Sequence, residues 1–418
     1  MIENFKISLK EIDKINLINE DDKNYRIKNL EFFNQKGFPT KKEEDWKFSD
    51  LREIFYKNFK KIDINYNHPE ENKFRQIEDF DHNYILLING RLITSDFKFE
   101  DKNKIKINNY KEENFSREKS NNPLICLNDA LSNTGYNLEI DENYKFEKVL
   151  VIYNLFSEDL SEKVLNNKNK ITVNKNSELH TIEYTINKSK NKFFNNTNEK
   201  VIVNENSKFK NICIQAGRSE GYFHKFLNGS IKSDSQYSSF IFSSGLRFNK
   251  QDIKIDLEGK NSNCEIKSAL FLNNDDHHEI KTLVNHMVPN CKSFQKIKNI
   301  LKDGSKGIFQ GKVHVSKEAQ KTDAYQISKG LLLDQKSEFS TKPELEIYAD
   351  DVKCSHGSTS GNIDEQAQYY LMSRGLSKKK ATDLIVKGFL ADVISDIKNK
   401  DLKKIINSHL DEVINYEN

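Results

Sequence analysis

Proline and glycine are scarce in this 418-residue chain, which contains 5 Pro and 16 Gly. Collagen-like chains and Pro/Gly-rich disordered chains are therefore excluded. No apolar run approaches the roughly 20 residues that a membrane-spanning helix needs, and the mean hydropathy is −0.77. Aromatic residues make up 11% of the chain, and they supply the large apolar groups that disordered chains lack. We expect a folded protein of two or three domains with no membrane association.

Positive and negative charges almost cancel, because the chain has 66 Lys and Arg residues and 63 Asp and Glu residues, which give a net charge of +3. A nucleic-acid-binding protein usually carries a strongly basic domain or stripe, and this sequence has none. The lysines are interspersed with Asp, Glu and Asn, as they are on a solvated surface. We therefore expect no nucleic-acid partner, and we expect the charged side chains to be exposed.

The five cysteines are odd in number and are spread over more than 200 residues, from Cys126 to Cys354. Because no C-x-x-C pair occurs, they indicate neither a disulfide framework nor a zinc ribbon. The first residues, MIENFKISLKEIDKIN, have neither the apolar centre of a signal peptide nor an Arg-rich transit pattern. We expect a reducing, cytoplasmic location.

Residues 1–145 are expected to form a mainly helical N-terminal domain with a small β element. A turn at 37–39 is followed by Thr40-Lys41-Lys42-Glu43, which has the form of a capping box at the start of a helix. Near residue 84 the pattern changes to short apolar runs on both sides of Asn89-Gly90. This dipeptide is a strong signal for a two-residue hairpin turn.

Residues 146–357 have a different character, because short β-rich runs such as 148–153 and 170–173 follow one another without a convincing helix. Similar turns recur between them, in several cases about 30 residues apart, as at 174–177 and 204–207. Such a repeat length is typical of solenoids. Asn, which occurs 50 times in the chain, suits these turns because it tolerates left-handed backbone. We predict a mainly β protein with a parallel β-helix (solenoid) core, with a sandwich or closed barrel as the alternative.

Residues 358–418 are expected to form a C-terminal helical domain. A first helix covers 364–372 and is followed by Gly375 in the usual C′ position. Ser377 caps a second helix, and a third follows near residue 402. The apolar spacing of the second helix predicts one face of Ala381, Leu384, Ile385, Gly388, Phe389 and Val393.

Two further patterns carry little chemical signal. Gly307–Val313 superficially resembles a phosphate-binding P-loop, but it has one residue too few and a valine in place of the Mg²⁺-binding Ser or Thr. We interpret it as a tight solenoid corner and expect no ATP hydrolysis. Another group of potential metal ligands lies close together in the sequence: His277, His278, His286 and Cys291. On a strand, His277 and His278 would point to opposite faces, and His286 would lie far from both. We therefore do not expect these residues to share a metal ion.

Cys354 and His356 form a more informative pair. An extended backbone places Val352, Cys354 and His356 on one face of a strand. A thiolate and an imidazole two residues apart suit a soft or borderline metal such as iron or zinc. Two ligands do not make a site, so the others must come from elsewhere in the fold or from another subunit. Spacing alone favours the structural interpretation, in which a small thiol is buried and a histidine is hydrogen-bonded.

A resemblance to a known family lies in the residues around this pair. The run DDVKCSHGSTSG at 350–361, followed by YYLMSRGL at 369–376, is similar to the C-terminal signature of the SufB/SufD family of iron–sulfur cluster assembly proteins. FQGKV at 309–313 and GFPTKKEEDWK at 37–47 match the same family. The Cys-Ser-His-Gly run looks like the D type of this family, and none of the cysteine motifs associated with the B type is evident.

The resemblance implies a right-handed parallel β-helix between helical domains, in a non-catalytic scaffold subunit of an iron–sulfur cluster assembly complex. It implies pairing with a SufB-like paralogue through the β-helix and docking of a SufC-like ABC-type ATPase on the C-terminal helices. An isolated chain could form a homodimer. The interface histidine of the family falls on His356, with Cys354 as a weaker candidate. Iron or an Fe–S cluster would be shared with the SufB-like partner, and this chain alone would bind no cofactor tightly.

Two other functions stay open on the sequence. A SufB-type scaffold would carry the cluster itself, and the iron and sulfide content of the isolated chain would discriminate it. A carbohydrate-active enzyme could also use a parallel β-helix. Such an enzyme usually carries a cluster of catalytic carboxylates and a secretion signal, and neither is evident here.

Overall fold

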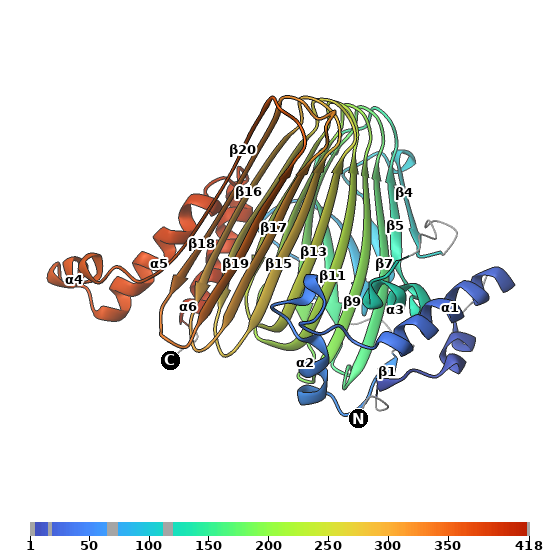
Figure 1. The fold of residues 1–418 in the computed structure, drawn as a ribbon, viewed down its shortest axis with the longest axis horizontal. Helices are drawn as coiled ribbons and strands as arrows, with labels where there is room; N and C mark the ends of the chain where they lie inside the picture. Colours follow the sequence, from blue (N-terminus) through green and yellow to red (C-terminus); the bar gives the residue numbers. More distant parts are fainter. Residues whose placement is uncertain (1–4, 16–18, 65–73, 112–119, 416–418) are drawn as a thin grey trace.

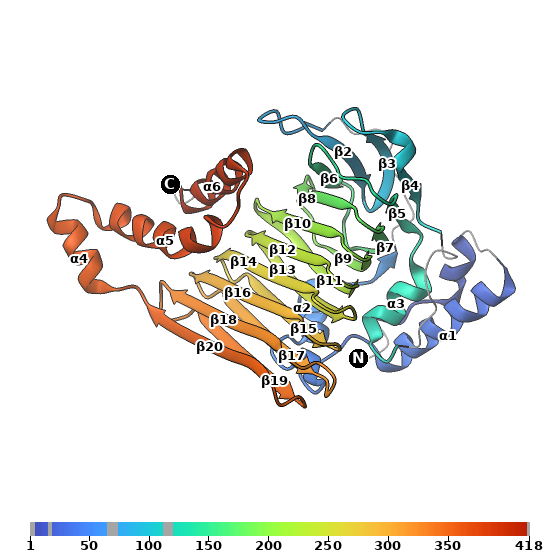
Figure 2. The same cartoon turned by 90° about the horizontal axis from the view of Figure 1, so that it is seen from above.

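The computed structural model describes residues 5–15, 19–64, 74–111 and 120–415. Two parallel sheets face each other, and from β5 onward successive strands alternate between them (Figures 1 and 2). The chain thereby forms a parallel β-solenoid of about eight turns with helices at both ends. The predicted mainly β fold with a β-helix core is confirmed.

The first sheet consists of β2 (Asn83–Ile88), β6 (Leu150–Phe156), β8 (Glu178–Asn187), β10 (Lys208–Gln215), β12 (Gln236–Ser243), β14 (Asn263–Leu272), β16 (Lys292–Leu301), β18 (Thr322–Leu332) and β20 (Val352–Asn362). The second consists of β5 (Thr134–Ile140), β7 (Lys163–Val173), β9 (Phe193–Val203), β11 (Ser219–Ile231), β13 (Leu246–Leu257), β15 (His277–His286), β17 (Lys306–Val315) and β19 (Glu338–Ile347). The short strands β1 (Asp63–Ile64), β3 (Arg91–Asp96) and β4 (Ile105–Asn109) extend the first coils.

The N-terminal helices are α1 (Glu20–Lys36), α2 (Leu51–Asn58) and α3 (Pro123–Leu131), with 3₁₀ turns at Leu9–Lys14, Glu44–Trp46 and Lys102–Lys104. The C-terminal helices are α4 (Glu365–Ser373), α5 (Lys378–Ile394) and α6 (Lys400–Asn415). The predicted cap at Ser377 is confirmed, because its side chain caps α5. Asp364, expected as the first residue of its helix, instead precedes α4, and its side chain caps it. Gly375 follows α4 with a φ of 94°.

Three apolar clusters hold the layers together. One fills the space between the two sheets with residues such as Ile171, Ile255 and Leu270. A second joins the outer face of the first sheet to α5 and α6, and a third joins the outer face of the second sheet to α1, α2 and α3. Each sheet is therefore buried on both faces along much of its length, which explains the continuous apolar runs in the strands.

The recurring Asn turns stack into ladders. Asn176 and Asn206 both have left-handed backbone, with φ values of 59° and 57°. The amide of Asn206 donates to the Asn176 side chain 30 residues earlier, at 2.8 Å. In the same turn as Asn206, Ser207 donates its hydroxyl to the Asn174 carbonyl of the preceding coil at 2.7 Å. The 30-residue repeat of the sequence is thus the length of one coil, and Asn stabilises both its own turn and the next one.

The predicted hairpin is also confirmed. β2 and β3 pair antiparallel, and Asn89 and Gly90 between them have φ values of 51° and 84°. β2 also pairs with β6, and β5 pairs with β7, so strands from residues 1–145 continue both sheets. The division of the chain at residues 145 and 357 stays a prediction.

Several local expectations are wrong in detail. Glu43 accepts from the Thr40 backbone as in a capping box, but the following helix α2 starts only after Asp50, whose side chain caps it. Gly307–Val313 lies inside strand β17 and is not a solenoid corner. A Cβ at Gly311 would lie 2.4 Å from the ring of Phe309, so the glycine makes room for this ring.

The buried face of α5 also differs from the predicted one. Ala381 and Val393 of the predicted face are buried, but Leu384 is exposed. The other buried residues of the helix were not predicted: Val386, Leu390 and Ile394. Contacts with the sheet, and not the apolar spacing alone, decide which stripe of the helix is covered.

Candidate functional site

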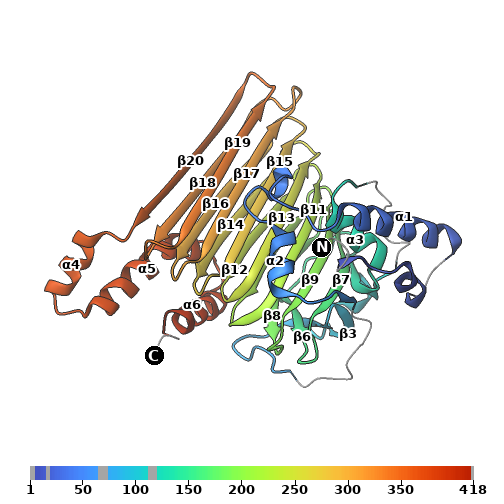
Figure 3. The same ribbon diagram turned by 60° about the horizontal axis from the view of Figure 1, so that its bottom comes forward.

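The end of the solenoid at β19 and β20 is open. β20 pairs with β18, and β19 pairs with β17. Within the described part of the chain, the outer edges of β19 and β20 have no strand partner. Figure 3 shows both strands at the end of the stack farthest from α1. Edge strands present unpaired N–H and C=O groups, and these can pair with another chain.

Both candidate ligands lie on β20, at this open end. Cys354 is in register with Ala324 of β18, and His356 is in register with Gln326. Cys354 is half-buried and packs on an apolar cluster that includes Val313 and Ala324. His356 is exposed. Because register partners point to the same face, both side chains face inward at the mouth of the last coil.

A buried amide lies directly beneath His356. Gln326 is only 1% exposed, yet neither its amide nitrogen nor its amide oxygen has a hydrogen-bond partner among the described residues. One coil deeper, Gln295 is in register with Gln326, and its amide nitrogen is also without a partner. Buried polar groups without partners cost free energy, so they indicate a missing partner. His356 thus lies above a column of amides that the chain alone leaves unsatisfied.

The chemistry of the pair is incomplete within one chain. Burial raises the pKa of the Cys354 thiol above its ordinary value, so the thiol stays protonated at neutral pH. A bound metal ion would favour the thiolate. The described residues contain no group of three or more His, Cys, Asp or Glu that could hold a metal ion. Among the described residues, the pair therefore lacks the further ligands that iron or a cluster would need.

The other histidines and cysteines have separate surroundings. His277 is hydrogen-bonded to the Ser49 hydroxyl at 2.7 Å, whereas His278 contacts the Leu246 carbonyl at 2.9 Å. His286 contacts Ser293, and Cys291 donates to the Gly259 carbonyl. Burial lowers the pKa of His277 to about 3 and that of His278 to about 4. The expectation that these residues do not share one site agrees with their separate partners.

A second feature, an exposed apolar surface on the C-terminal helices, was not predicted from the sequence. Aromatic and aliphatic side chains are exposed on α4 and on the first half of α5, which project away from the sheets (Figure 2). They form the helix patch, defined as Tyr369, Tyr370, Met372 and Leu384. The sequence signal was the adjacent Tyr pair, because two neighbouring helical residues cannot both face a narrow buried stripe.

The second half of α5 is anchored to the first sheet. Asp392 accepts from Lys298 at 2.5 Å and pairs with Lys296 at 3.1 Å. The ammonium of Lys298 also lies 4.5 Å from the ring centroid of Phe389. Phe389, expected above to lie on the apolar face, therefore contacts the solenoid. The helix patch is held at a distance from the sheets by this anchor.

Comparison with known families agrees with this architecture. The family model for the SufBD core domain of the SUF system of FeS cluster assembly matches residues 156–389. A second family model, for the SufBD N-terminal region, matches residues 13–105. The first match covers more than half of the chain.

The chain belongs to the SufBD family. Among curated relatives, the iron–sulfur cluster assembly protein SufD of Escherichia coli is 25% identical over 374 residues, which cover 88% of this chain and 87% of that protein. Protein ABCI7 from the chloroplast of Arabidopsis thaliana is 26% identical over 244 residues, or 57% of this chain and 51% of that protein. A SufBD family protein of Pyrococcus horikoshii is 33% identical over 151 residues, which cover 35% of this chain and 33% of that protein.

This SufBD family member is SufD-like and takes part in Fe–S cluster assembly. No helix in the described ranges is long and apolar enough to cross a lipid bilayer. The family match leaves no support for a carbohydrate-active enzyme.

Proposed function

We propose that the chain is a non-catalytic scaffold subunit that joins a SufB-like paralogue to a SufC-like ABC-type ATPase in the reducing cytoplasm. The open end of the solenoid carries this proposal. There, two unpaired strand edges surround His356 and the unsatisfied amide of Gln326. A second solenoid docked on this end would pair the edges and cover the amide column. The five cysteines form no disulfide, which suits a reducing compartment.

The paralogue would complete the ligand set at this interface. His356 contributes an exposed imidazole, and Cys354 contributes a half-buried thiol two residues earlier on the same strand. Two residues from this chain and others from the partner would hold iron or a nascent cluster as cargo. A site divided between two chains can be opened by moving them apart, which suits a cluster that must be handed on. The isolated chain would pair its open ends as a homodimer.

The ATPase would dock on the helix patch. Tyr369 is 74% exposed and Leu384 is 52% exposed, although both are large apolar side chains. The guanidinium of Arg374 lies 5.2 Å from the ring of Tyr370 and adds a positive rim to the patch. Exposed apolar side chains with a polar rim are typical of protein-binding surfaces. A movement of the docked ATPase would shift α4, and the anchored second half of α5 would transmit this shift to the solenoid.

Co-purification with both partners tests the two surfaces separately. Leu384→Asp should abolish capture of the ATPase and leave capture of the paralogue intact. Tyr348→Asp, at the end of β19 where Tyr348 is exposed, should have the opposite effect and also abolish the homodimer. Asn407→Asp on the exposed face of α6 adds the same charge and should change neither. If Leu384→Asp still captures the ATPase in full, the helix patch is not its docking site.

The shared site is tested by the iron and sulfide content of the assembled complex. His356→Ala should lower both, and His356→Ala with Cys354→Ser should lower them further. His180→Ala is a matched control, because His180 is a half-buried histidine far along the solenoid whose imidazole is hydrogen-bonded to Glu178. An unchanged iron and sulfide content in His356→Ala would remove His356 from the site.

A further inference from the structure

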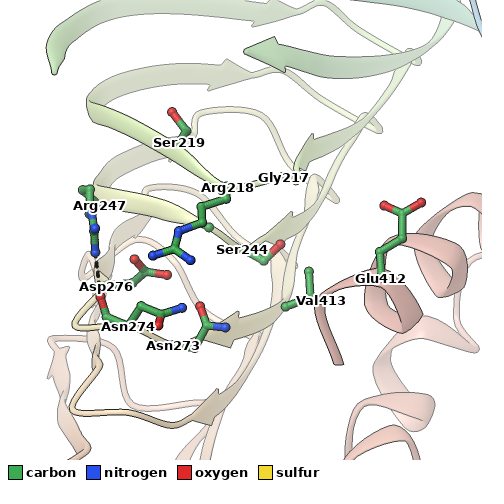
Figure 4. Close-up of a pocket in the computed structure, with 11 residues that line it drawn as sticks. Gly217, Arg218, Ser219, Ser244, Arg247, Asn273, Asn274, Asp276, Glu412 and Val413 are labelled. Atoms are coloured by element: carbon green, nitrogen blue, oxygen red, sulfur yellow. Dashed lines mark hydrogen bonds between the residues drawn. The ribbon is translucent and has the colours of Figure 1, made fainter. Parts of the chain in front are cut away.

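A small cavity lies where three consecutive coil corners meet helix α6, far from the open end of the solenoid (Figure 4). Its volume is about 130 Å³. A single water needs roughly 10–15 Å³, and pockets for drug-sized ligands measure roughly 300–1,000 Å³. The cavity therefore has room for a few waters or a small ion, but not for a nucleotide.

Two buried polar atoms in the wall of this cavity have no hydrogen-bond partner in the part of the chain that the structure describes. Asp276 is 3% exposed, and one of its carboxyl oxygens has no partner. Ser244 is completely buried, and its hydroxyl has no partner either. In native proteins such groups are nearly always satisfied by the protein, by water or by a ligand. Both atoms therefore indicate an occupant of the cavity.

The next coil carries a serine where this coil carries Asp276. Because His277 is in register with Lys306, Asp276 stands one coil before Ser305 at the same corner. The Ser305 hydroxyl accepts from the Lys302 backbone at 3.0 Å and donates to the Leu272 carbonyl at 3.1 Å. In that next coil a small hydroxyl group therefore both accepts and donates at this corner. Asp276 can accept here, but it donates only when its carboxyl group is protonated.

Two arginines supply positive charge on the same side. Arg247 is already engaged, because it donates to Glu220 at 3.1 Å and to the Asn274 carbonyl at 2.8 Å. Within the described part of the chain, Arg218 makes no hydrogen bond or ion pair. Figure 4 shows its guanidinium group directed toward the same space as the Asp276 carboxyl group. The free positive charge at this cavity is therefore that of Arg218.

We propose that this cavity binds a small oxyanion, held by the Arg218 guanidinium, the Ser244 hydroxyl and the protonated carboxyl group of Asp276. Arg218 is suited to this role because a guanidinium group can make two parallel hydrogen bonds to phosphate or carboxylate oxygens. Ser244 donates its hydroxyl, and Asp276 donates its carboxyl proton. All three unpartnered groups are satisfied by one ligand.

The charges around Asp276 make the binding depend on pH. Burial raises the pKa of Asp276 to about 7; the Asn273 backbone, Arg247 and Arg218 oppose this shift, and Glu220 adds to it. Glu412 of α6 also lines the cavity, but its side chain is 66% exposed and contacts His409. Because only the protonated site accepts the anion, affinity should fall about tenfold between pH 6 and pH 8.

Calorimetric titration of the full chain in an oxyanion-free buffer tests this site. Sulfate is the probe for the pH series, since its charge does not change between pH 6 and pH 8. Phosphate and succinate, compared at pH 6, distinguish a phosphate site from a carboxylate site. We expect Arg218→Gln to weaken binding about 10- to 100-fold and Ser244→Ala to weaken it less. Arg75→Gln, at another exposed arginine, should leave binding unchanged.

Asp276→Asn provides the decisive comparison, because the asparagine amide donates at every pH. This variant should retain sulfate binding and lose its pH dependence. The proposal is overturned if none of the three anions binds at millimolar concentration, which would leave a cavity that holds only water. It is also overturned if Arg218→Gln binds as tightly as the unchanged protein, or if Asp276→Asn keeps the full pH dependence.

Discussion

Replacing Lys250 should release the N-terminal segment from the solenoid. The side chains of Lys250 and Glu279 are completely buried and form an ion pair across neighbouring strands. Lys250 also pairs with Asp252 at 3.2 Å, and it donates to the Asp45 carbonyl of the N-terminal segment at 3.0 Å. Burial by itself lowers the pKa of Lys250, but the two carboxylates outweigh it and raise the pKa. The ammonium group is therefore charged, and it links the second sheet to the segment before α2.

Lys250→Met keeps the length of the side chain and removes its charge. Glu279 and Asp252 then remain buried without the Lys250 ammonium group, and the His224 imidazole still contacts Asp252. Breaking a buried ion pair from one side costs about 3–5 kcal/mol of unfolding free energy, a large share of the roughly 5–15 kcal/mol of a typical domain. Adding Glu279→Gln removes one of the stranded charges. The double variant should therefore be more stable than the sum of the two single losses predicts.

Trp46 makes this prediction measurable. It is the only tryptophan of the chain, it is 2% exposed, and its ring lies 4.8 Å from the Lys250 ammonium group. Its fluorescence during urea unfolding at pH 7 reports the N-terminal contact, and far-UV circular dichroism reports the solenoid. We expect Lys250→Met to shift the fluorescence midpoint more than the dichroism midpoint.

Lys281→Met is the matched control for this experiment. Lys281 contacts Asp45 at the surface with a quarter of its side chain exposed, and exposed pairs contribute roughly 0–1 kcal/mol. A loss below about 1 kcal/mol in Lys250→Met, or a loss equal to that of the control, would refute the reasoning that the buried ammonium group stabilises the contact.

Three further predictions concern the turns, the buried histidines and the thiols. Asn206→Ala should cost about 1–2 kcal/mol, because alanine is strained at a φ of 57°, whereas Asn206→Gly should change the urea midpoint little. Burial lowers the pKa of His286 from 6.5 to about 4, so the unfolded chain takes up a proton first and stability is lost as the pH falls from about 6.5 to about 4. Between these pH values, His286→Gln should flatten the dependence of unfolding free energy on pH by about 1.4 kcal/mol per unit, and an unchanged slope would contradict the neutral buried imidazole. In the native state a thiol reagent should modify at most one of the five cysteines, Cys354, because the other four are buried; rapid modification of two or more would contradict this burial.

Much of the fold could be predicted because it depends on short-range patterns. The positive φ of Asn89 and Gly90, the cap at Ser377 and the left-handed Asn turns are set by residues close in sequence. The shared face of Cys354 and His356 follows from the alternation of a strand in the same way. Local backbone chemistry determines all of these features, so they could be predicted without knowing how the coils stack.

The expectation that charged side chains are exposed was wrong for several lysines and glutamates. Lys225 pairs with Glu183 and Glu199 inside the solenoid, and Lys250 pairs with Glu279. These partners lie on different coils, about one or more repeats apart in the sequence. The local sequence does not distinguish a buried, paired lysine from an exposed one, because the register between coils determines which carboxylate lies beside it.

A repeating β chain with helical ends could be predicted from the sequence, as could its 30-residue coil and the shared strand face of Cys354 and His356. The packing of the coils was needed to show that this strand is the last one of the stack, above Gln326, and that Asp276, Ser244 and Arg218 share one cavity. It also decided which face of α5 is covered and which residues form the helix patch. The reason is physical: periodicity depends on neighbours along the chain, whereas burial and charge pairing depend on which coils and helices come to lie side by side.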